Sequence, residues 1–191
     1  MEAKLSFNPH WGRRTFLKAS LLTVLAVSGG QFAWARELLE DGLPPGKISL
    51  LNTHTSERLE VTYRDRTGEY DLAALNEISW LLRCHHTDEV GEIDVRTIEF
   101  LSLVDQRLGG NREFHIISGY RSPAYNELLR QQGRGVAKRS LHLEGKAIDI
   151  RVPGVKLSAL RRAALSLEYG GVGYYPHTGF VHLDSGNFRT W

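Results

Sequence analysis

Hydrophobic and polar side chains alternate along two segments in the last quarter of the chain, residues 146–152 and 179–184. A period of two residues predicts a β-strand whose apolar side chains face a core while the remaining side chains face the opposite way. The positions expected to face the core are Ile148, Ile150, Val152, Val181 and Leu183.

The opposite faces of the same two strands carry side chains that could bind a ligand. Asp149 lies on the first strand, and His182 and Asp184 lie on the second. If the two strands pair antiparallel, Asp149 and His182 converge on one face of the sheet. The pattern therefore predicts a polar cluster on the face that points away from the core.

Apolar side chains recur every three to four residues in three other segments, which predicts helices over residues 71–86, 94–108 and 157–167. Asp71 is a plausible N-cap for the first of them. A further helix is expected to begin near Pro123, because proline suits the first turn of a helix.

Strands are also expected in the first part of the folded region. Residues 48–54 and 57–63 are β-prone and are separated only by Thr55 and Ser56, so they predict a hairpin. Residues 114–117 predict a further strand, which leads to the helix near Pro123.

The first 35 residues have the layout of a secretory signal. Arg13 and Arg14 precede an apolar run over residues 21–27, and Ala33-Trp-Ala35 offers a small-x-small cleavage site. The paired arginines indicate the twin-arginine pathway, which exports folded proteins. An uncleaved membrane anchor is the alternative, but the run is shorter than the roughly 20 residues that a spanning helix needs. We therefore expect a periplasmic protein with no stable membrane insertion after cleavage.

Removal of residues 1–35 leaves a chain that is close to neutral. The leader carries four of the 24 basic residues and one of the 22 acidic residues, which leaves 20 against 21. Such a balance provides no electrostatic footprint for nucleic acid. Residues 36–47 lack a period and predict a linker, whereas residues 48–191 fit one domain. The single cysteine, Cys84, is expected to be a buried small apolar side chain.

A third candidate ligand, His142, precedes Asp149 by seven residues, with Gly145 and Ala147 between them. Two histidines and an aspartate are a suitable ligand set for zinc, and three protein ligands leave the fourth position open, as in catalytic sites. Other histidines carry weaker signals. His85 and His86 are adjacent on a predicted helix and point in different directions, so a polar helix end near solvent is the preferred interpretation. No role is assigned on this evidence to His54, His115 and His177.

Arg121 follows a predicted strand and precedes a predicted helix, a place where side chains often face a binding site. Its guanidinium is suited to holding a carboxylate by two hydrogen bonds, and a surface salt bridge is the alternative. Residues 131–139 are polar and lack a period, which predicts a loop that could cover a cleft and contact a substrate.

The pattern Ser140-x-His142-x-x-Gly145-x-Ala147-x-Asp149, followed by a histidine on a late strand, resembles the superfamily of D-alanyl-D-alanine carboxypeptidases, murein endopeptidases and the Hedgehog signalling domain. The segment Tyr120-Arg-Ser122 resembles its substrate-side arginine motif. The ending, with Gly-Gly-Val-Gly-Tyr-Tyr-Pro over residues 170–176 and Phe-Val-His-Leu-Asp-Ser-Gly over residues 180–186, is similar to the exported DUF882 or YcbK-like branch. The resemblance covers residues 114–191.

The resemblance implies an α+β fold with a small antiparallel sheet, helices on one side and zinc on one face, bound by His142, Asp149 and His182. It implies zinc-dependent hydrolysis of peptide bonds in peptidoglycan cross-links or stem peptides, as in DD-carboxypeptidases and endopeptidases. Arg121 would hold a substrate carboxylate. A peptidoglycan peptide is the expected partner, and accessory cell-wall proteins are a further candidate partner.

One feature departs from the family pattern. Relatives commonly place a glutamate as general base a few residues before the last histidine, where this chain has Pro176, and Phe180 stands at the first histidine of a His-x-His motif. Asp184 is the favoured substitute base and His177 is the alternative. The missing glutamate keeps a second function open, a catalytically inactive zinc-bearing module that binds the cell wall. A purely structural metal fits less well, because three ligands do not complete a tetrahedron.

Overall fold

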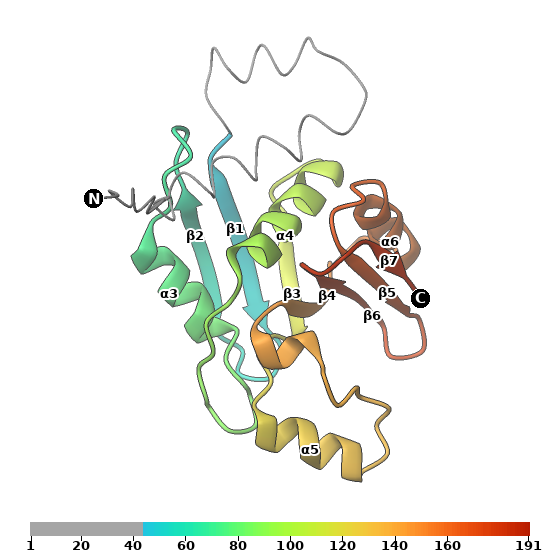
Figure 1. Cartoon of the computed structure of the whole chain (residues 1–191). Helices are drawn as coiled ribbons and strands as arrows, with labels where there is room; N and C mark the ends of the chain where they lie inside the picture. Colours follow the sequence, from blue (N-terminus) through green and yellow to red (C-terminus); the bar gives the residue numbers. More distant parts are fainter. Residues whose placement is uncertain (1–43) are drawn as a thin grey trace, which may run out of the picture.

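The computed structural model describes residues 44–191, so the predicted leader and most of the predicted linker lie outside the described residues. Helices and strands alternate irregularly along the chain around one sheet (Figure 1). The strands are β1 (Gly46–Asn52), β2 (Arg58–Arg64), β3 (Glu113–Ser118), β4 (Ala147–Arg151), β5 (Gly171–Tyr175), β6 (Phe180–Asp184) and β7 (Arg189–Thr190). The helices are α3 (Leu72–Leu81), α4 (Val95–Arg107), α5 (Pro123–Gln131), α6 (Leu157–Leu165) and the 3-10 helix η1 (Leu141–Glu144).

The sheet contains seven strands in the order β2-β1-β3-β4-β6-β5-β7. The predicted hairpin is confirmed as β1 and β2, and the predicted antiparallel pairing of the two late strands is confirmed as β4 and β6. The α+β class is also confirmed. The sheet is larger than expected and is mixed, because β1 pairs with β3 and β5 pairs with β7 in parallel.

Three helices pack against one face of the sheet and share a single apolar core with it. α3, α4 and α6 supply buried side chains to this core, together with the apolar positions of β4 and β6. α5 stands apart from the core layer, beyond the end of the sheet where β1 and β3 finish (Figure 1). Only Asn126 of α5 is buried. The prediction of helices on one side of the sheet therefore holds for α3, α4 and α6, while α5 lies outside this layer.

Helix α3 begins as predicted and ends earlier than predicted. The Asp71 carboxylate accepts hydrogen bonds from the backbone N–H groups of Ala73 and Ala74, at 2.8 and 3.2 Å, which caps the first turn. The helix stops at Leu81, because the last carbonyls bond to other segments: Leu81 O accepts from Asn52 Nδ2 and Leu82 O accepts from the N–H of Tyr120. The helix predicted up to residue 86 was therefore too long.

The residues beyond this early end form a loop. Cys84 is fully buried, as predicted, but lies in the loop and not on a helix. His85 stacks on His54 with ring centroids 3.6 Å apart, and His86 stacks on Tyr125 at 4.5 Å. The two histidines thus help to join the hairpin turn, this loop and α5, which corrects the interpretation of them as a polar helix end.

Helix α4 contributes one partner of a buried ion pair. Glu99 of α4 and Arg64 of β2 are both nearly inaccessible, and Arg64 Nε donates to Glu99 Oε1 at 2.7 Å. The hydroxyl of Tyr70 donates to the same oxygen at 3.0 Å. The pair therefore satisfies both of its charges inside the protein.

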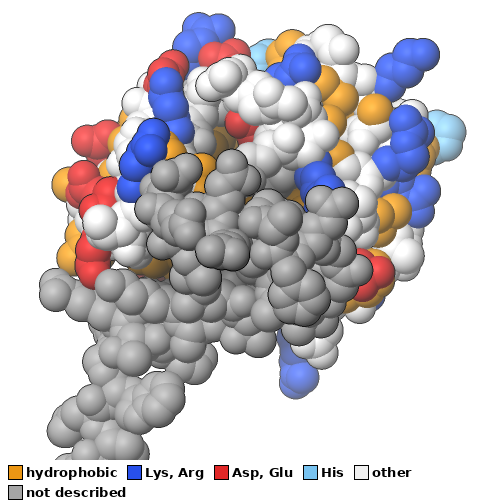
Figure 2. All heavy atoms as spheres, turned by 90° about the horizontal axis from the view of Figure 1, so that it is seen from above, with side chains coloured by type: hydrophobic (Ala, Val, Ile, Leu, Met, Phe, Trp, Pro, Cys, Tyr) orange, Lys and Arg blue, Asp and Glu red, His pale blue; other side chains and the backbone are white. Residues whose placement is uncertain are grey.

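Two general features of the described residues bear on partners. None of their helices is long and apolar enough to cross a membrane. Figure 2 shows Lys and Arg side chains interspersed with Asp and Glu side chains over the visible face, several of the acidic ones at its left edge.

Candidate metal centre

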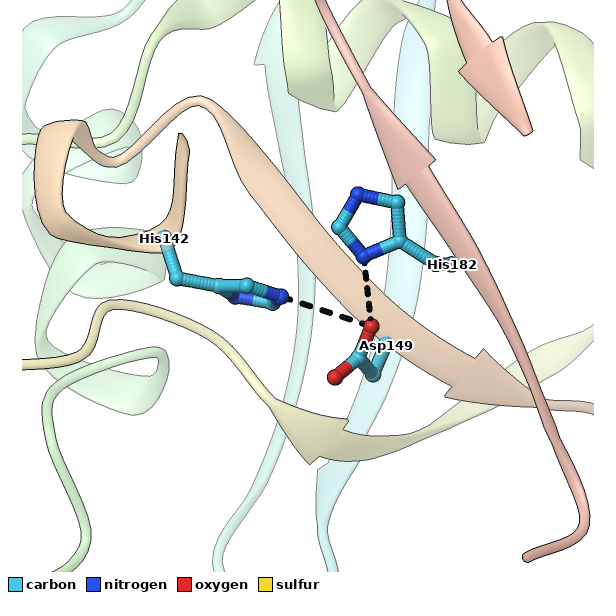
Figure 3. Close-up of side chains that lie close together, drawn as sticks. All are labelled: His142, Asp149 and His182. Carbon is cyan, nitrogen blue, oxygen red and sulfur yellow. Dashed lines mark hydrogen bonds and ion pairs between the residues drawn. The ribbon is translucent and has the colours of Figure 1, made fainter. Parts of the chain in front are cut away.

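The polar cluster lies on the face of β4 and β6 that points away from the core. Asp149 is paired directly with His182 across the two strands, while the neighbouring pair of Ile148 and Leu183 faces the core. His142 reaches the same point from η1 (Figure 3). One ligand atom from each of the three side chains lies within 4.8 Å of the others. The predicted convergence of Asp149 and His182 is thus confirmed, and His142 joins them.

Local backbone geometry explains the spacing that brings His142 to the cluster. The Ser140 hydroxyl accepts from the N–H of His142 and caps η1, which gives the chain a tight turn before β4. Gly145 ends that turn with a φ of 63°, and a Cβ there would lie 2.0 Å from the carbonyl oxygen of Glu92. Only glycine therefore fits the position, because both its conformation and its closeness to backbone exclude a side chain.

A backbone carbonyl determines which nitrogen of His142 can act as a ligand. Nδ1 of His142 lies 2.8 Å from the carbonyl oxygen of Gly119, and a carbonyl can only accept, so Nδ1 carries the proton. Nε2 then holds the lone pair of the neutral ring, and it faces Asp149 Oδ1 at 3.4 Å. The ring is buried, so this orientation is well constrained.

His182 lies between two carboxylates. Its Nδ1 is 2.8 Å from Asp149 Oδ1 and its Nε2 is 3.1 Å from Asp184 Oδ2. Burial alone would lower the pKa of this imidazole, but hydrogen bonds to the two carboxylates outweigh burial and raise the pKa to about 9. The ring is therefore held with one nitrogen directed at the cluster and the other directed away from it.

Asp149 is the centre of the cluster. Burial would raise the pKa of its carboxyl group, but the charges and hydrogen bonds of His142 and His182 hold it below the usual value. Asp149 is therefore held in its ionised form in the metal-free protein.

Asp184 lies on the same face as His182 and is completely buried. Arg189 binds it in two-point fashion, with distances of 2.9 Å to Oδ1 and 2.7 Å to Oδ2, and the N–H of Gly186 donates to Oδ1 at 2.9 Å. Burial would raise the pKa of Asp184, but the hydrogen bonds from His182, Arg189 and Gly186 lower it. Both carboxylate oxygens are thus occupied in this structure.

Arg121 lies beside the cluster, between β3 and α5, where it was predicted. Its side chain is 8% exposed, and within residues 44–191 its only side-chain hydrogen bond runs from an Nη atom to Asn126 Oδ1, at 3.3 Å. Nε is buried and has no hydrogen-bond partner. Burial lowers the pKa of this guanidinium, and the charge of Asp149 acts in the opposite direction. Arg121 is consequently a buried cation with unused donors near a carboxylate.

The other candidate residues lie away from this group. His177 is exposed in the turn between β5 and β6. His54 bonds to the carbonyl of Ile117 and stacks on His85, while His115 on β3 bonds to Glu113. The loop over residues 132–140 is exposed along most of its length and leads from α5 to η1.

Several residues of the site were not predicted. Arg189 and Trp191 come to the site because β7 pairs with β5, and Trp191 lies with its ring centroid 5.3 Å from that of His182. The carbonyl of Gly119 was also missed. A single arginine at this position gives no signal of its own in the sequence.

The donor set fits a metal ion. Two imidazole nitrogens and one carboxylate oxygen are typical zinc ligands, and the three side chains leave room in the coordination sphere for a further ligand. The hydrogen bond from His142 to Gly119 fixes a ligand in the manner seen around metal-binding histidines. His142, Asp149 and His182 are therefore the residues that could hold a metal.

Comparison with known proteins supports a cell-wall peptidase family. Residues 42–191 match the family model Peptidase_M15_2, described as peptidoglycan L,D-endopeptidase MepK. The chain is 40% identical over 149 residues to the peptidoglycan L,D-endopeptidase MepK of Escherichia coli K12, covering 77% of this chain and 80% of the relative. It is also 40% identical over 148 residues to the probable MepK of Haemophilus influenzae, covering 77% and 79%. The chain therefore belongs to the Peptidase_M15_2 family of murein endopeptidases.

Proposed function

We propose that this protein is a zinc peptidase that hydrolyses L,D peptide bonds in peptidoglycan. The observation that carries the proposal is the buried group of His142, Asp149 and His182 in a chain of this family. The sequence motifs did not indicate which type of peptidoglycan bond is cut. The relatives are named L,D-endopeptidases, and we therefore propose the L,D bond.

The three side chains are proposed to bind one zinc ion through His142 Nε2, a carboxylate oxygen of Asp149 and His182 Nδ1. These atoms are the ones that remain when Gly119 O and Asp184 Oδ2 occupy the other imidazole nitrogens. When bound, zinc would lower the pKa of a water molecule and polarise the peptide carbonyl. The protein itself would hold the ligand atoms in place and exclude competing water from the buried side of the group.

Arg121 is proposed to bind a carboxylate of the stem peptide. A buried guanidinium with an unpaired Nε is costly unless a ligand supplies the partner, and a carboxylate matches its two-point geometry. Its closeness to Asp149 would place the bound peptide next to the metal group. This contact would orient the substrate and would not take part in bond breaking.

The general base has two candidates, and both stay predictions. Asp184 is near the metal group, but its two oxygens already accept hydrogen bonds from His182, Arg189 and Gly186. His177 is exposed and would have to reach the substrate from the β5–β6 turn. If His177 is the base, His177→Ala should abolish turnover while zinc content is unchanged.

The test is digestion of purified sacculi by the wild-type protein, with the products identified by mass spectrometry. We expect release of peptides cut at L,D bonds, and loss of that release after chelation. Products cut at D,D bonds alone would contradict the bond assignment. Zinc-dependent binding to sacculi without any cleavage would instead support the inactive cell-wall binding module, which the occupied oxygens of Asp184 favour as the second candidate.

Export through the twin-arginine pathway to the periplasm is proposed from Arg13 and Arg14, which lie outside the described residues. Replacing both by lysine should leave the precursor inside the cell, because the paired guanidinium groups form the recognised signal. Normal periplasmic yield of the mature form from this double variant would refute the assignment.

A further inference from the structure

A chain of three side chains runs from the protein surface to the metal group. Arg189, with 44% of its side chain exposed, binds Asp184, which is completely buried, and Asp184 in turn lies 3.1 Å from Nε2 of His182. The charge of Arg189 offsets the cost of burying the carboxylate, and the N–H of Gly186 completes its hydrogen bonds. Asp184 is therefore fixed from two sides and cannot easily turn away from His182.

The two histidines of the group are oriented by opposite nitrogens. Nδ1 of His142 bonds to the carbonyl oxygen of Gly119, so its Nε2 faces Asp149. In His182 the nitrogens are reversed: Nε2 bonds to Asp184, and Nδ1 faces Asp149. A partner on the far nitrogen fixes the tautomer and the ring orientation of a metal ligand and strengthens its basicity. Each histidine thus has one contact that selects the nitrogen facing the metal group.

We propose that Asp184 and Arg189 form a positioning pair that presents Nδ1 of His182 to zinc. The proposal rests on the proposed zinc site and gives Asp184 a role other than general base. Asp184 accepts the N–H of His182, and Arg189 holds Asp184 in the orientation that allows this. Both residues would act through His182 and not on the reacting peptide bond.

The strand beside β6 is shaped to accommodate the pair. Gly171 of β5 is paired with Asp184, and a Cβ at this position would lie 2.3 Å from Asp184 Oδ2 and 2.7 Å from an Nη atom of Arg189. A side chain there would push the carboxylate or the guanidinium out of place. The bare backbone of β5 therefore provides the space that the positioning pair occupies.

Gly173 provides a matched comparison on the same face of the same strand. It pairs with His182, and the three atoms nearest to a Cβ there belong to the ring of Trp191, at 2.8–2.9 Å, whereas those nearest to a Cβ at Gly171 belong to Asp184 and Arg189. Gly171→Ala disturbs the pair without removing any charged group, and Gly173→Ala introduces the same methyl group two residues away. The two variants separate displacement of the pair from general crowding of β5.

The test is a zinc titration of the chelated full-length protein against a chromophoric competing chelator. Asp184→Asn and Gly171→Ala are expected to weaken zinc affinity by about 10- to 100-fold, while Gly173→Ala stays within about threefold of the wild type. Arg189→Lys keeps the charge but loses the two-point geometry, so a smaller loss is expected. Nitrogen NMR of His182 in the zinc-loaded protein should report a proton on Nε2 in the wild type.

Each outcome decides one question. A wild type that binds no zinc contradicts the proposed function itself. A wild type that binds zinc, together with unchanged affinity in Asp184→Asn and Gly171→Ala, overturns the positioning pair alone, and lost turnover in Asp184→Asn would then support the base role. If a variant lowers the unfolding temperature of the chelated protein but keeps its zinc affinity, then the ion pair of Asp184 and Arg189 is merely structural. Should Asp184→Asn fail to fold, Arg189→Lys and Gly171→Ala decide the question.

Discussion

Two buried arginines, Arg64 and Arg121, show how differently a charge can be used inside the same domain. Arg64 is 4% exposed and Arg121 is 8% exposed, so both have lost nearly all contact with water. Arg64 donates to Glu99, which raises its pKa, although burial acts in the opposite direction. Burial lowers the pKa of Arg121, which has an amide oxygen as its only side-chain partner among the described residues.

The contrast between the two arginines indicates where a ligand is expected. A buried charge is stable only when it is paired and hydrogen-bonded, and the cluster around Glu99 meets this condition within the protein. Arg121 meets it incompletely, since Nε is buried without a partner. This incomplete pairing next to a metal-binding group is the basis of the proposal that the partner of Arg121 arrives with the substrate.

The largest effect is expected at the metal group beside Arg121. His182→Ala removes one of three zinc ligands, so zinc should be lost from the purified protein and peptidase activity should fall by about 10³-fold or more. His86→Ala, at an exposed histidine, serves as the control and should keep both. Metal analysis that finds full zinc occupancy in His182→Ala would falsify the ligand set.

Loss of the buried pair of Arg64 and Glu99 should reduce the stability of the fold. Glu99→Gln leaves the charge of Arg64 buried without a counter-charge and should reduce the free energy of unfolding by about 3–5 kcal/mol. Glu113→Gln, which alters the partly exposed pair with Arg58, should cost at most about 1 kcal/mol. Chemical denaturation of the chelated proteins measures both values. Equal losses in the two variants would contradict a special role for the buried pair.

Arg121 should respond in substrate binding. Arg121→Lys keeps a positive charge but loses two-point geometry, so kcat/KM for a stem peptide should fall by about 10- to 100-fold with zinc content unchanged. The free energy of unfolding should change little, because the only internal side-chain partner that can be lost among the described residues is the uncharged amide of Asn126, at 3.3 Å. If Arg121→Lys destabilises the protein as strongly as Glu99→Gln and leaves kcat/KM intact, then Arg121 is structural like Arg64.

The last expected effect concerns pH and the metal-free protein. Asp149 and Asp184 raise the pKa of His182 from 6.5 to about 9 in the folded state. Protonation of His182 therefore stabilises the fold fully below pH 6.5, and this contribution is lost as the pH rises through 9. The unfolding free energy of the chelated protein should fall over this window, and His182→Gln should lack that fall. A wild type as flat as the variant would contradict the contacts of His182.

Much of this site could be predicted because it follows from local periods. The alternation around Ile148 and Val181 was sufficient to place Asp149 and His182 on one face. The cap was evident from the position of Asp71 at the start of a helical pattern. What the sequence missed depends on distant contacts. Strand β5 has glycine at 171 and 173, where a strand would ordinarily carry side chains, and it was not among the predicted strands.

Other misses have the same origin. Helix α3 ends at Leu81 because Asn52 and Tyr120, distant in sequence, bond to carbonyls at its end. Arg189 reaches Asp184 only because β7 pairs with β5. No period within a single segment reports such contacts, and for this reason the hydrogen bonds from Arg189 to both oxygens of Asp184 were not predicted.

The central claim is tested most directly by measuring cleavage of peptidoglycan L,D bonds during a zinc titration of the chelated wild-type protein. We predict no cleavage without metal and a rate that rises to a plateau at about one zinc per chain, as expected for one site built from His142, Asp149 and His182. Cleavage at the full rate by the chelated protein, or a plateau only at two or more zinc ions per chain, would contradict it.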